Sequence, residues 1–249
     1  MLETASLAGF KGFEAEIDML GPYFTRPQEL ASLLDQYHME LAALVLHQDW
    51  EGASQTEEER ALSTQAVDFL KHFPFAKLMM SHHAGVKPRG EGAALEARRK
   101  NLFACMQEAA AQAAEAGIVS CFHPNSAKNS LFVSAEDYQV LFELLSAGPI
   151  GWAPDVGHIV NGGIDALPLM KDHRQLIRHV HFKDRSSDGT WTVMGKGAID
   201  YPAIVRFLAG TGYGGWIMVE DESPQAEQDP DSVVRLDGAY MSDIVRRES

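Results

Sequence analysis

The sequence predicts an α/β protein with a parallel sheet, and more narrowly a (β/α)8 TIM barrel whose first strand is lacking or shortened. Short apolar runs alternate with longer amphipathic runs along the 249 residues, which is typical of βα units. The expected strands end one after another in a histidine or a carboxylate, and the carboxyl ends of barrel strands meet at one rim. No Gly-x-Gly-x-x-Gly motif follows the first expected strand, so the main signature of a dinucleotide-binding open sheet is absent.

In chain order, each expected strand is followed by an expected helix. The strands are the short apolar runs at residues 12–18, 40–47, 76–82, 118–123, 150–155, 178–183 and 215–220. The helices are the longer amphipathic runs at residues 27–37, 56–72, 93–116, 135–146, 165–171, 201–209 and 230–246. Some helices have a clear start signal, because Ser134 can cap the helix that follows it and Asp137 stands three residues on.

The amino terminus departs from this alternation. A barrel of eight strands begins with a strand, whereas this sequence begins in an expected helix at residues 2–8, followed by Gly9-Phe-Lys-Gly12. A lacking strand leaves two unpaired strand edges, so we expect reduced stability or pairing with another chain. We expect residues 1–249 to form a single domain.

The charge balance disfavours a nucleic-acid partner. Lys and Arg number 21 against 35 Asp and Glu, which gives a net charge of −14, and an acidic surface repels phosphate backbones. Cys105 and Cys121 are the only cysteines and lie in apolar surroundings typical of reduced thiols. The first ten residues carry Glu3 where a secretory signal carries a basic residue, and no apolar run approaches ~20 residues. We therefore expect a cytoplasmic protein without a membrane segment.

Four strand ends form the strongest candidate site. His123, Asp155, His181 and Glu220 each end an expected strand, and they are separated by 32, 26 and 39 residues. These spacings match one strand-helix unit each, the last one lengthened. Two imidazoles and two carboxylates suit one divalent ion, with Mn²⁺, Co²⁺ or Mg²⁺ favoured and Zn²⁺ or Fe²⁺ also compatible. The alternative is that these strand ends are polar without binding a metal.

Five sequence segments together resemble the xylose-isomerase-like TIM-barrel superfamily, and among its branches they are most similar to the inosose dehydratases. They are Cys121-Phe-His-Pro-Asn125, Pro154-Asp-Val-Gly-His158, His179-Val-His-Phe-Lys-Asp184, Gly195-Lys-Gly-Ala-Ile-Asp200 and Gly212-Tyr-Gly-Gly-Trp-Ile-Met-Val-Glu220. The resemblance is best between about Gly117 and Pro230. It implies a TIM barrel in which one divalent ion is held at four strand ends, commonly by Glu, Asp, His and Glu.

Carried over by position, that ligand set falls on His123, Asp155, His181 and Glu220. Many of the isomerases have a glutamate at the position of His123. This chain has a histidine there, like the dehydratase branch. Related epimerases use two metal-bound glutamates on opposite faces of the substrate, so the replacement disfavours that mechanism here. A dehydration needs one base and one acid, which this site can supply. The resemblance thus implies a lyase or isomerase that acts on a keto-sugar or keto-cyclitol through an enediolate, with dehydration preferred.

Three residues are candidates for catalysis. Glu220 is expected to act in catalysis as well as to bind the metal. Lys183 lies two residues beyond His181, on the same strand face if the strand continues. It is either a general acid or electrostatic partner or else a rim ion pair with Asp184. His158 matches a substrate-contacting histidine of the family, although it could instead anchor the following loop.

Further polar residues are expected to bind substrate hydroxyls at the same mouth. Glu222 lies one strand period beyond Glu220 and matches a Glu-x-Glu pattern of the dehydratase branch, although it could equally belong to a solvated acidic rim. Together with His158, the candidates for substrate binding are Glu14, His47, His82, Asn125 and Glu222.

Alternative functions remain open from the sequence. Related barrels cleave 3-keto-glycosides (C- or O-glycosides) by β-elimination through the same enolate. A related group of abasic-site endonucleases holds three zinc ions, but the net charge of −14 opposes DNA binding. The chain could also be a non-catalytic sugar-binding barrel, or one that needs a partner subunit or a second copy to complete its rim.

Overall fold

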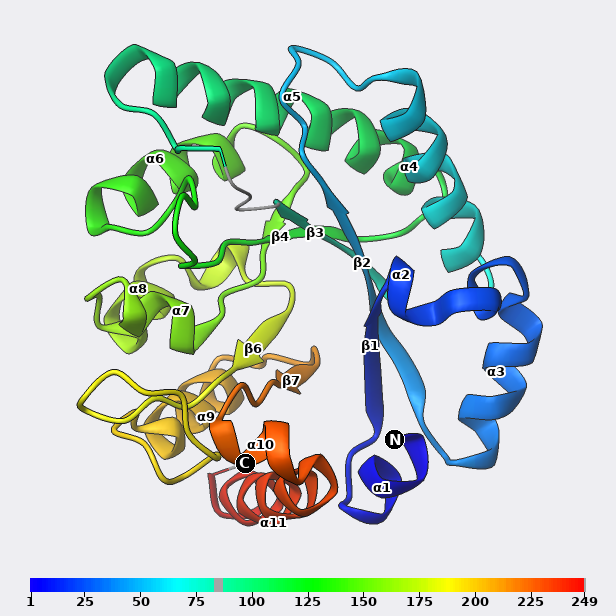
Figure 1. Ribbon diagram of the computed structural model, residues 1–249, viewed down its shortest axis with the longest axis vertical. Coiled ribbons are helices and arrows are strands. Elements are labelled where there is room, and N and C mark those ends of the chain that lie inside the picture. Colours follow the sequence, from blue (N-terminus) through cyan, green and yellow to red (C-terminus); the bar gives the residue numbers. More distant parts are fainter. Residues whose placement is uncertain (83–86, 249) are drawn as a thin grey trace.

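Seven parallel strands curve around a central axis in the computed structural model, which describes residues 1–82 and 87–248 (Figure 1). Five of them form one sheet in sequence order: β1 (Gly12–Glu16), β2 (Glu40–Gln48), β3 (Lys77–His82), β4 (Ser120–His123) and β5 (Gly151–Trp152). The last two, β6 (Val180–Phe182) and β7 (Ile217–Val219), pair with each other. Isolated bridges from Trp152 to Ile177 and from Asp155 to His181 connect the two sheets. The expected parallel α/β arrangement is confirmed.

The larger helices form a ring outside the strands (Figure 1). They are α1 (Leu2–Leu7), α3 (Pro27–Gln36), α4 (Glu57–Leu70), α5 (Gly92–Glu115), α6 (Ala135–Ser146), α8 (Ala166–Asp172), α9 (Tyr201–Gly210) and α11 (Pro230–Glu248). The expected capping box at Ser134 is present, and Thr56 forms a second one at the start of α4. Among the described helices, none has both the length and the apolar character needed to cross a membrane.

Several short elements were not expected from the sequence. They are α2 (Ile17–Leu20), η1 (Gly21–Thr25), α7 (Val156–Asn161), η2 (Arg174–Leu176) and α10 (Pro224–Gln228). Helices of one or two turns are too short to show a 3.6-residue period. The strand expected at residues 150–155 is also shorter than predicted, since β5 covers only Gly151–Trp152. Asp155 keeps an isolated bridge to His181 and caps α7, where its Oδ1 accepts the His158 N–H at 2.9 Å.

Apolar side chains pack on both faces of the strands. The large ones, such as Leu44, Met80 and Trp152, face the surrounding helices and are almost completely buried. Inside the barrel, a smaller cluster lies beneath the mouth and consists of Ala43, Val45, Met79, Cys121 and Ala153. The alternation of side chains along each strand separates these two cores. Both cysteines are free and buried, as expected from the sequence.

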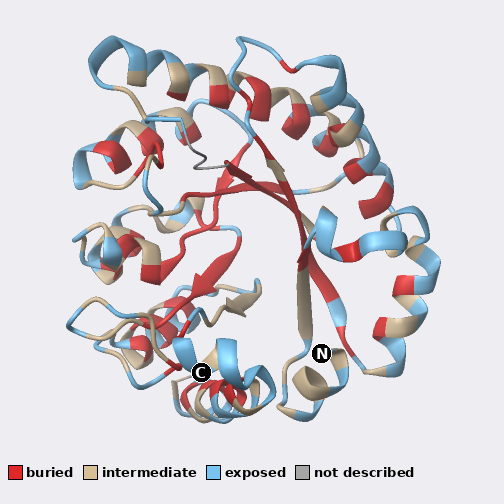
Figure 2. Ribbon diagram, in the orientation of Figure 1, coloured by how far each residue is buried: buried red, intermediate tan, exposed pale blue. Residues whose placement is uncertain are grey.

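The barrel wall has a seam between β1 and β7. Within residues 1–82 and 87–248, no backbone pairing joins these two strands. They are mostly half-buried, whereas β3 to β6 are almost wholly buried (Figure 2). A cavity of about 320 Å³, lined largely by apolar side chains such as Phe13 and Trp216, lies at the seam. The unpaired strand edges expected from the sequence are therefore present here.

A buried carboxyl group on α11 makes stability depend on pH. Asp237 is 2% exposed and accepts the Met194 N–H at 3.0 Å. Burial, together with the nearby carboxyls of Asp221 and Asp184, raises the pKa of Asp237 from 3.8 to about 7. The folded protein therefore holds this proton more tightly than the unfolded chain does. The free energy of unfolding falls as pH rises from about 4 through 7, because the folded state must give up the proton over that range.

Replacing Asp237 by Asn is expected to stabilise the protein above pH 7, because the amide keeps the acceptor for Met194 and carries no charge. We expect the melting temperature to rise by about 2–4 °C at pH 8, the size of shift that ~1 kcal/mol gives in a chain of this length, and by less at pH 5. Calorimetry at both pH values measures this. Asp243→Asn on the same helix is the control, and a gain that is equal at the two pH values would contradict the assignment.

Candidate active site and metal centre

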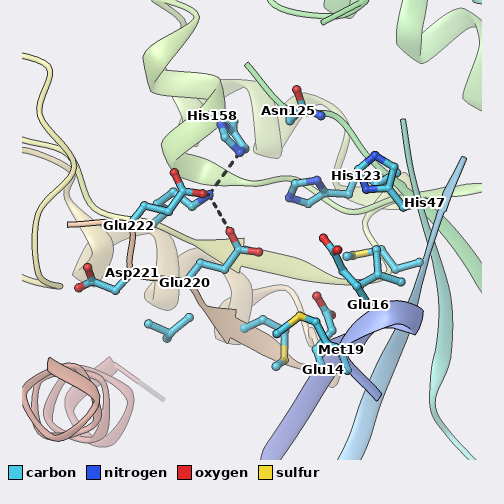
Figure 3. Close-up of a pocket in the computed structure, with 17 residues that line it drawn as sticks. Glu14, Glu16, Met19, His47, His123, Asn125, His158, Glu220, Asp221 and Glu222 are labelled. Carbon is cyan, nitrogen blue, oxygen red and sulfur yellow. Dashed lines mark hydrogen bonds and ion pairs between the residues drawn. The ribbon is translucent and has the colours of Figure 1, made fainter. Parts of the chain in front are cut away.

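A cavity of about 470 Å³ opens at the carboxyl ends of the strands (Figure 3). The backbone register explains which side chains reach it, since His47 of β2 lies opposite Ser81 of β3, and Ser81 lies opposite His123 of β4. The other residues that line it are Glu14, Ala15, Glu16, Met19, Val45, Met79, Asn125, His158, Lys183, Met218, Val219, Glu220, Asp221 and Glu222. Five of these are carboxylates, so the cavity is strongly acidic.

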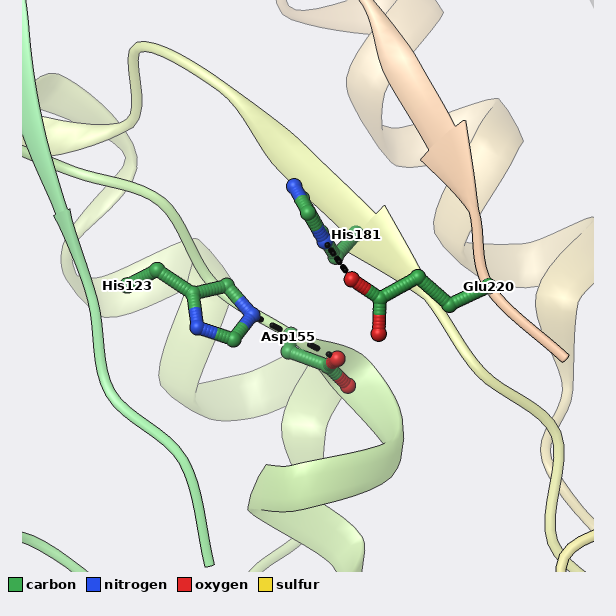
Figure 4. A group of neighbouring side chains, drawn as sticks. All are labelled: His123, Asp155, His181 and Glu220. Atoms are coloured by element: carbon green, nitrogen blue, oxygen red, sulfur yellow. Dashed lines mark hydrogen bonds and ion pairs between the residues drawn. The ribbon is translucent and has the colours of Figure 1, made fainter. Parts of the chain in front are cut away.

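Four side chains converge at one side of this cavity, as Figure 4 shows. They are His123, Asp155, His181 and Glu220, and one ligand atom from each lies within 4.8 Å of the other three. His123 Nε2 is 3.5 Å from Asp155 Oδ2, and His181 Nδ1 is 2.9 Å from Glu220 Oε1. The structure thus brings together the four residues that the spacing of the strand ends singled out.

The backbone fixes where these groups stand. His181 N–H donates to the carbonyl of Pro154, and Glu220 N–H donates to the carbonyl of Phe182, at 2.8 and 2.9 Å. Asp155 uses Oδ1 to cap α7, which leaves Oδ2 directed at His123. Asp155, His181 and Glu220 therefore each have their position set by a hydrogen bond that does not use the side-chain atom facing the cluster.

The atoms of this cluster fit a cation better than they fit one another. His123 Nε2 and Asp155 Oδ2 are buried, and neither has a hydrogen-bond partner among the described residues. Orphaned buried polar atoms are costly. Burial opposes the charged form of Asp155, but His158, His123 and Lys183 outweigh it and lower its pKa to about 2. A mixed set of imidazole nitrogens and carboxylate oxygens suits a divalent ion of the first transition row or Mg²⁺.

Lys183 lies beside this cluster and is 1% exposed. Its Nζ is 2.6 Å from Glu220 Oε2, 2.8 Å from Glu222 Oε1 and 3.8 Å from Asp155 Oδ2. Burial lowers its pKa, but the three carboxylates outweigh burial and raise it, so Lys183 carries a charge at neutral pH. The alternative of a rim ion pair with Asp184 is wrong, because Lys183 pairs with Glu220 and Glu222. Asp184 instead accepts the backbone N–H groups of Gly195 and Gly197.

His158 stands on α7 at the edge of the cavity. Its Nδ1 is 2.8 Å from Ser126 Oγ, and its Nε2 is 3.4 Å from Lys183 Nζ. Burial is the main reason that the pKa of His158 falls to about 4. The ring is therefore neutral at pH 7, and its Nε2 faces the mouth as a proton acceptor (Figure 3).

Gly157 explains how α7 can approach Lys183. A Cβ at this position would overlap the carbonyl oxygen and the Cβ of Lys183. We expect Gly157→Ala to lower the free energy of unfolding by about 1–3 kcal/mol, the usual cost of overpacking, and to displace Lys183. Urea unfolding measures the loss. Gly210→Ala is the control, since nothing lies within 4 Å of an added Cβ there, and equal effects of the two substitutions would contradict this explanation.

The remaining predicted substrate ligands divide into two groups. Glu14, His47, Asn125 and Glu222 line the cavity, whereas His82 does not and instead lines a separate small cavity with Leu102 and Phe132. The reason is the alternation along β3, in which Ser81 faces the barrel interior and its neighbour faces away. Asn125 is partly committed already, because its Nδ2 donates to the His82 carbonyl at 3.2 Å.

Some residues of the site were not identified from the sequence. Glu16, Met19 and Ser81 line the cavity, and His179 contacts Glu14 at 2.7 Å just below it. His179 could have been found, because it lies two residues before His181 and a strand returns to the same face every second residue. Nothing in the sequence indicated that α2 would bring Met19 over the mouth.

The comparisons with known proteins agree with this architecture. The sequence pattern of the family described as the xylose isomerase-like TIM barrel matches residues 2–240 of this chain. The chain belongs to this family, and its fold is a TIM barrel, as the sequence resemblance predicted.

The chain is similar to several individual members of the family in sequence or in structure. The rhizopine catabolism protein MocC of Rhizobium meliloti is 29% identical over 266 aligned residues, which cover 94% of this chain and 76% of that protein. The inosose dehydratase of Lacticaseibacillus casei is 25% identical over 92% of this chain and 83% of its own length. The crystal structure of the IOLI protein with a binding zinc atom has a TM-score of 0.77 at 16% identity, covering 100% of this chain and 92% of that one. The last likeness shows the fold alone.

Proposed function

We propose that this chain, acting as one domain over residues 1–249, is a divalent-metal-dependent enzyme that enolises a keto-sugar or keto-cyclitol and dehydrates it. The observation that carries this proposal is the convergence of His123, Asp155, His181 and Glu220 beside a buried, charged lysine. The similarity to an inosose dehydratase over most of both chains supports the substrate class. No other part of the described cavity gathers as many groups suited to proton transfer and charge stabilisation.

The metal ligands would be His123 Nε2, Asp155 Oδ2, His181 Nδ1 and a carboxylate oxygen of Glu220. When bound, a divalent ion stabilises negative charge that develops on a substrate oxygen. Mn²⁺, Co²⁺ and Mg²⁺ suit this donor set, and Zn²⁺, which the IOLI structure is described as binding, and Fe²⁺ suit it as well.

Three side chains would handle the protons. Glu220 is ionised at neutral pH, because His181 and Lys183 outweigh burial and hold its pKa well below the usual range. Glu220 and the neutral His158 would accept the proton that leaves the carbon next to the carbonyl. The Lys183 ammonium, which lies between them, is the donor to the departing hydroxyl. An α,β-dehydration requires a base that takes the proton from the α-carbon and an acid that donates a proton to the hydroxyl leaving the adjacent β-carbon as water.

Dehydration is preferred over epimerisation because of His123. Epimerisation beside a carbonyl needs a proton acceptor on one face of the substrate and a donor on the other, and a pair of carboxylates supplies both. In this chain an imidazole that would bind the metal occupies one of those two positions. His47, Asn125 and Glu222 would bind the hydroxyl groups of the substrate around the mouth.

Metal analysis combined with solvent proton exchange tests the proposal without knowledge of the product. Protein loaded with each candidate ion is incubated in deuterated water with 2-keto-inositol, neutral keto-sugars and 3-keto-glycosides, and deuterium uptake and product formation are followed by NMR. We expect one ion per chain, exchange next to the carbonyl, loss of water, and loss of all activity on chelation. Turnover by metal-free protein would contradict the proposal, and β-elimination of a glycoside would redirect it to that reaction.

A further inference from the structure

Glu14 of β1 lies between two histidines of the chain segment that contains β6. Its Oε2 is 2.7 Å from His179 Nε2, and its Oε1 is 3.1 Å from His181 Nε2. The two imidazoles are completely buried and the Glu14 side chain is 10% exposed. Both carboxylate oxygens are thus engaged by rings below the mouth, which leaves little of Glu14 for a substrate hydroxyl.

These contacts reach the metal cluster through His181. The ring of His181 has Glu14 on its Nε2 side at 3.1 Å. On its Nδ1 side it has Glu220 at 2.9 Å, as Figure 4 shows. An imidazole that binds a cation through Nδ1 must carry its proton on Nε2, and a carboxylate placed at Nε2 selects that tautomer and fixes the plane of the ring. Glu14 Oε1 is the carboxylate oxygen placed for this role, at 3.1 Å from Nε2, although Nε2 makes no hydrogen bond of good geometry with it or with any other described group.

Glu14, His179 and His181 could instead form a second metal site, because one ligand atom from each also lies within 4.8 Å of the other two. That reading requires His181 to bind one cation through each nitrogen. A neutral imidazole has one N–H donor and one acceptor nitrogen, so it cannot do this without losing its single N–H proton. A contact between that N–H and the Glu14 carboxylate needs no such ionisation.

We infer that Glu14 is a positioning residue of the proposed metal centre: with its other oxygen fixed by His179, it holds the His181 ring so that Nδ1 faces the cation. The inference rests on the proposed function, since it concerns the same ion. It assigns to Glu14 a role that differs from the substrate binding expected from the sequence.

Zinc affinity and the state of the His181 ring together test the inference. Glu14→Met keeps a side chain of similar length but removes both acceptors, and we expect it to weaken Zn²⁺ binding about 10- to 100-fold, the usual cost of losing an outer-sphere partner. Glu14→Gln, which can still accept one N–H, recovers part of that loss. Calorimetric competition against a chelator of known affinity measures all three proteins.

Glu16→Met is the matched control, because it removes a carboxylate two residues along the same strand that lines the same cavity. Glu16 is solvent-exposed, so its loss should change the zinc affinity less than about fivefold. In nitrogen-15 NMR of the zinc form, we expect a protected His181 Nε2–H in the wild type and a faster-exchanging one in Glu14→Met. A purely structural role for Glu14 would not change that proton.

Each outcome decides the question. Equal losses in the Glu14 and Glu16 variants, or an unchanged affinity in Glu14→Met, overturn the inference while leaving the proposed function intact. Two zinc ions per wild-type chain, with one lost in Glu14→Met, establish the second metal site instead. A wild-type chain that binds no zinc or other divalent ion overturns the proposed function and this inference together. Should Glu14→Met fail to fold, Glu14→Gln carries the same comparison.

Discussion

Asp155→Asn is expected to lower the affinity for the divalent ion more than about 100-fold, beyond what outer-sphere partners usually contribute. Asp155 Oδ2 is buried and has no hydrogen-bond partner in the described part of the chain. This proposed ligand oxygen is therefore free to bind the ion. At matched ion concentrations, deuterium exchange into a keto-sugar should fall by about 10³-fold, because several kcal/mol of charge stabilisation are lost.

The control for this substitution is Asp165→Asn. Asp165 caps α8 through the Leu167 N–H as Asp155 caps α7 through the His158 N–H, and Asn is an equally good cap. Any effect of altered capping should therefore appear in both variants. Titration calorimetry and NMR exchange rates measured on the two proteins separate the roles, and similar ion affinities in both would rule out Asp155 as a ligand.

Lys183→Met is expected to reduce exchange and water loss about 10²- to 10⁴-fold, the range of general acid catalysis, without weakening the binding of the ion. Lys183 is the only cation among the described residues that line the cavity, apart from histidines. Its Nζ is held 2.6 Å from Glu220. Removing it takes a positive charge away from the cluster, so the affinity for a divalent ion should stay the same or rise.

Lys183→Arg distinguishes the two roles considered for this lysine. Arginine keeps the positive charge but does not give up its proton in proteins. If Lys183 acts as a proton donor, dehydration fails in Lys183→Arg while exchange next to the carbonyl survives in part. If it acts through its charge alone, both reactions survive. Rates of deuterium uptake and of water loss, measured separately on one substrate, give the answer, and full activity of Lys183→Met would exclude both roles.

The four-residue cluster could be anticipated from the sequence because its members repeat with the strand-helix unit. His123 ends β4, His181 lies on β6, and Asp155 and Glu220 follow β5 and β7. Parallel strands in a barrel end at one rim. The charge partners of Lys183 could not be predicted in this way, because Lys183 and Asp184 lie beyond the end of β6 and the alternation along a strand does not decide where they face.

Other features depend on contacts that the sequence does not encode locally. Glu14 and His179 are 165 residues apart and meet only because the barrel curves. The short helices α7 and α10 lack enough turns for a periodic pattern, yet α7 carries His158 into the site. The inward direction expected for His82 was wrong because the exact strand register decides which of two neighbouring residues faces the interior.

The seam between β1 and β7 has a mechanical consequence for the site. Glu14 lies on β1 at one margin of this opening, whereas Glu220 follows β7 at the other margin and His181 lies on β6, which pairs with β7. A closed ring of backbone hydrogen bonds would hold the two margins at a constant separation, but here side-chain contacts across the barrel must do so. Any increase in the separation of β1 and β7 would move the Glu14 carboxylate away from the His181 imidazole. The rigidity of the proposed ion-binding geometry therefore depends on how firmly side-chain contacts hold β1 and β7 together.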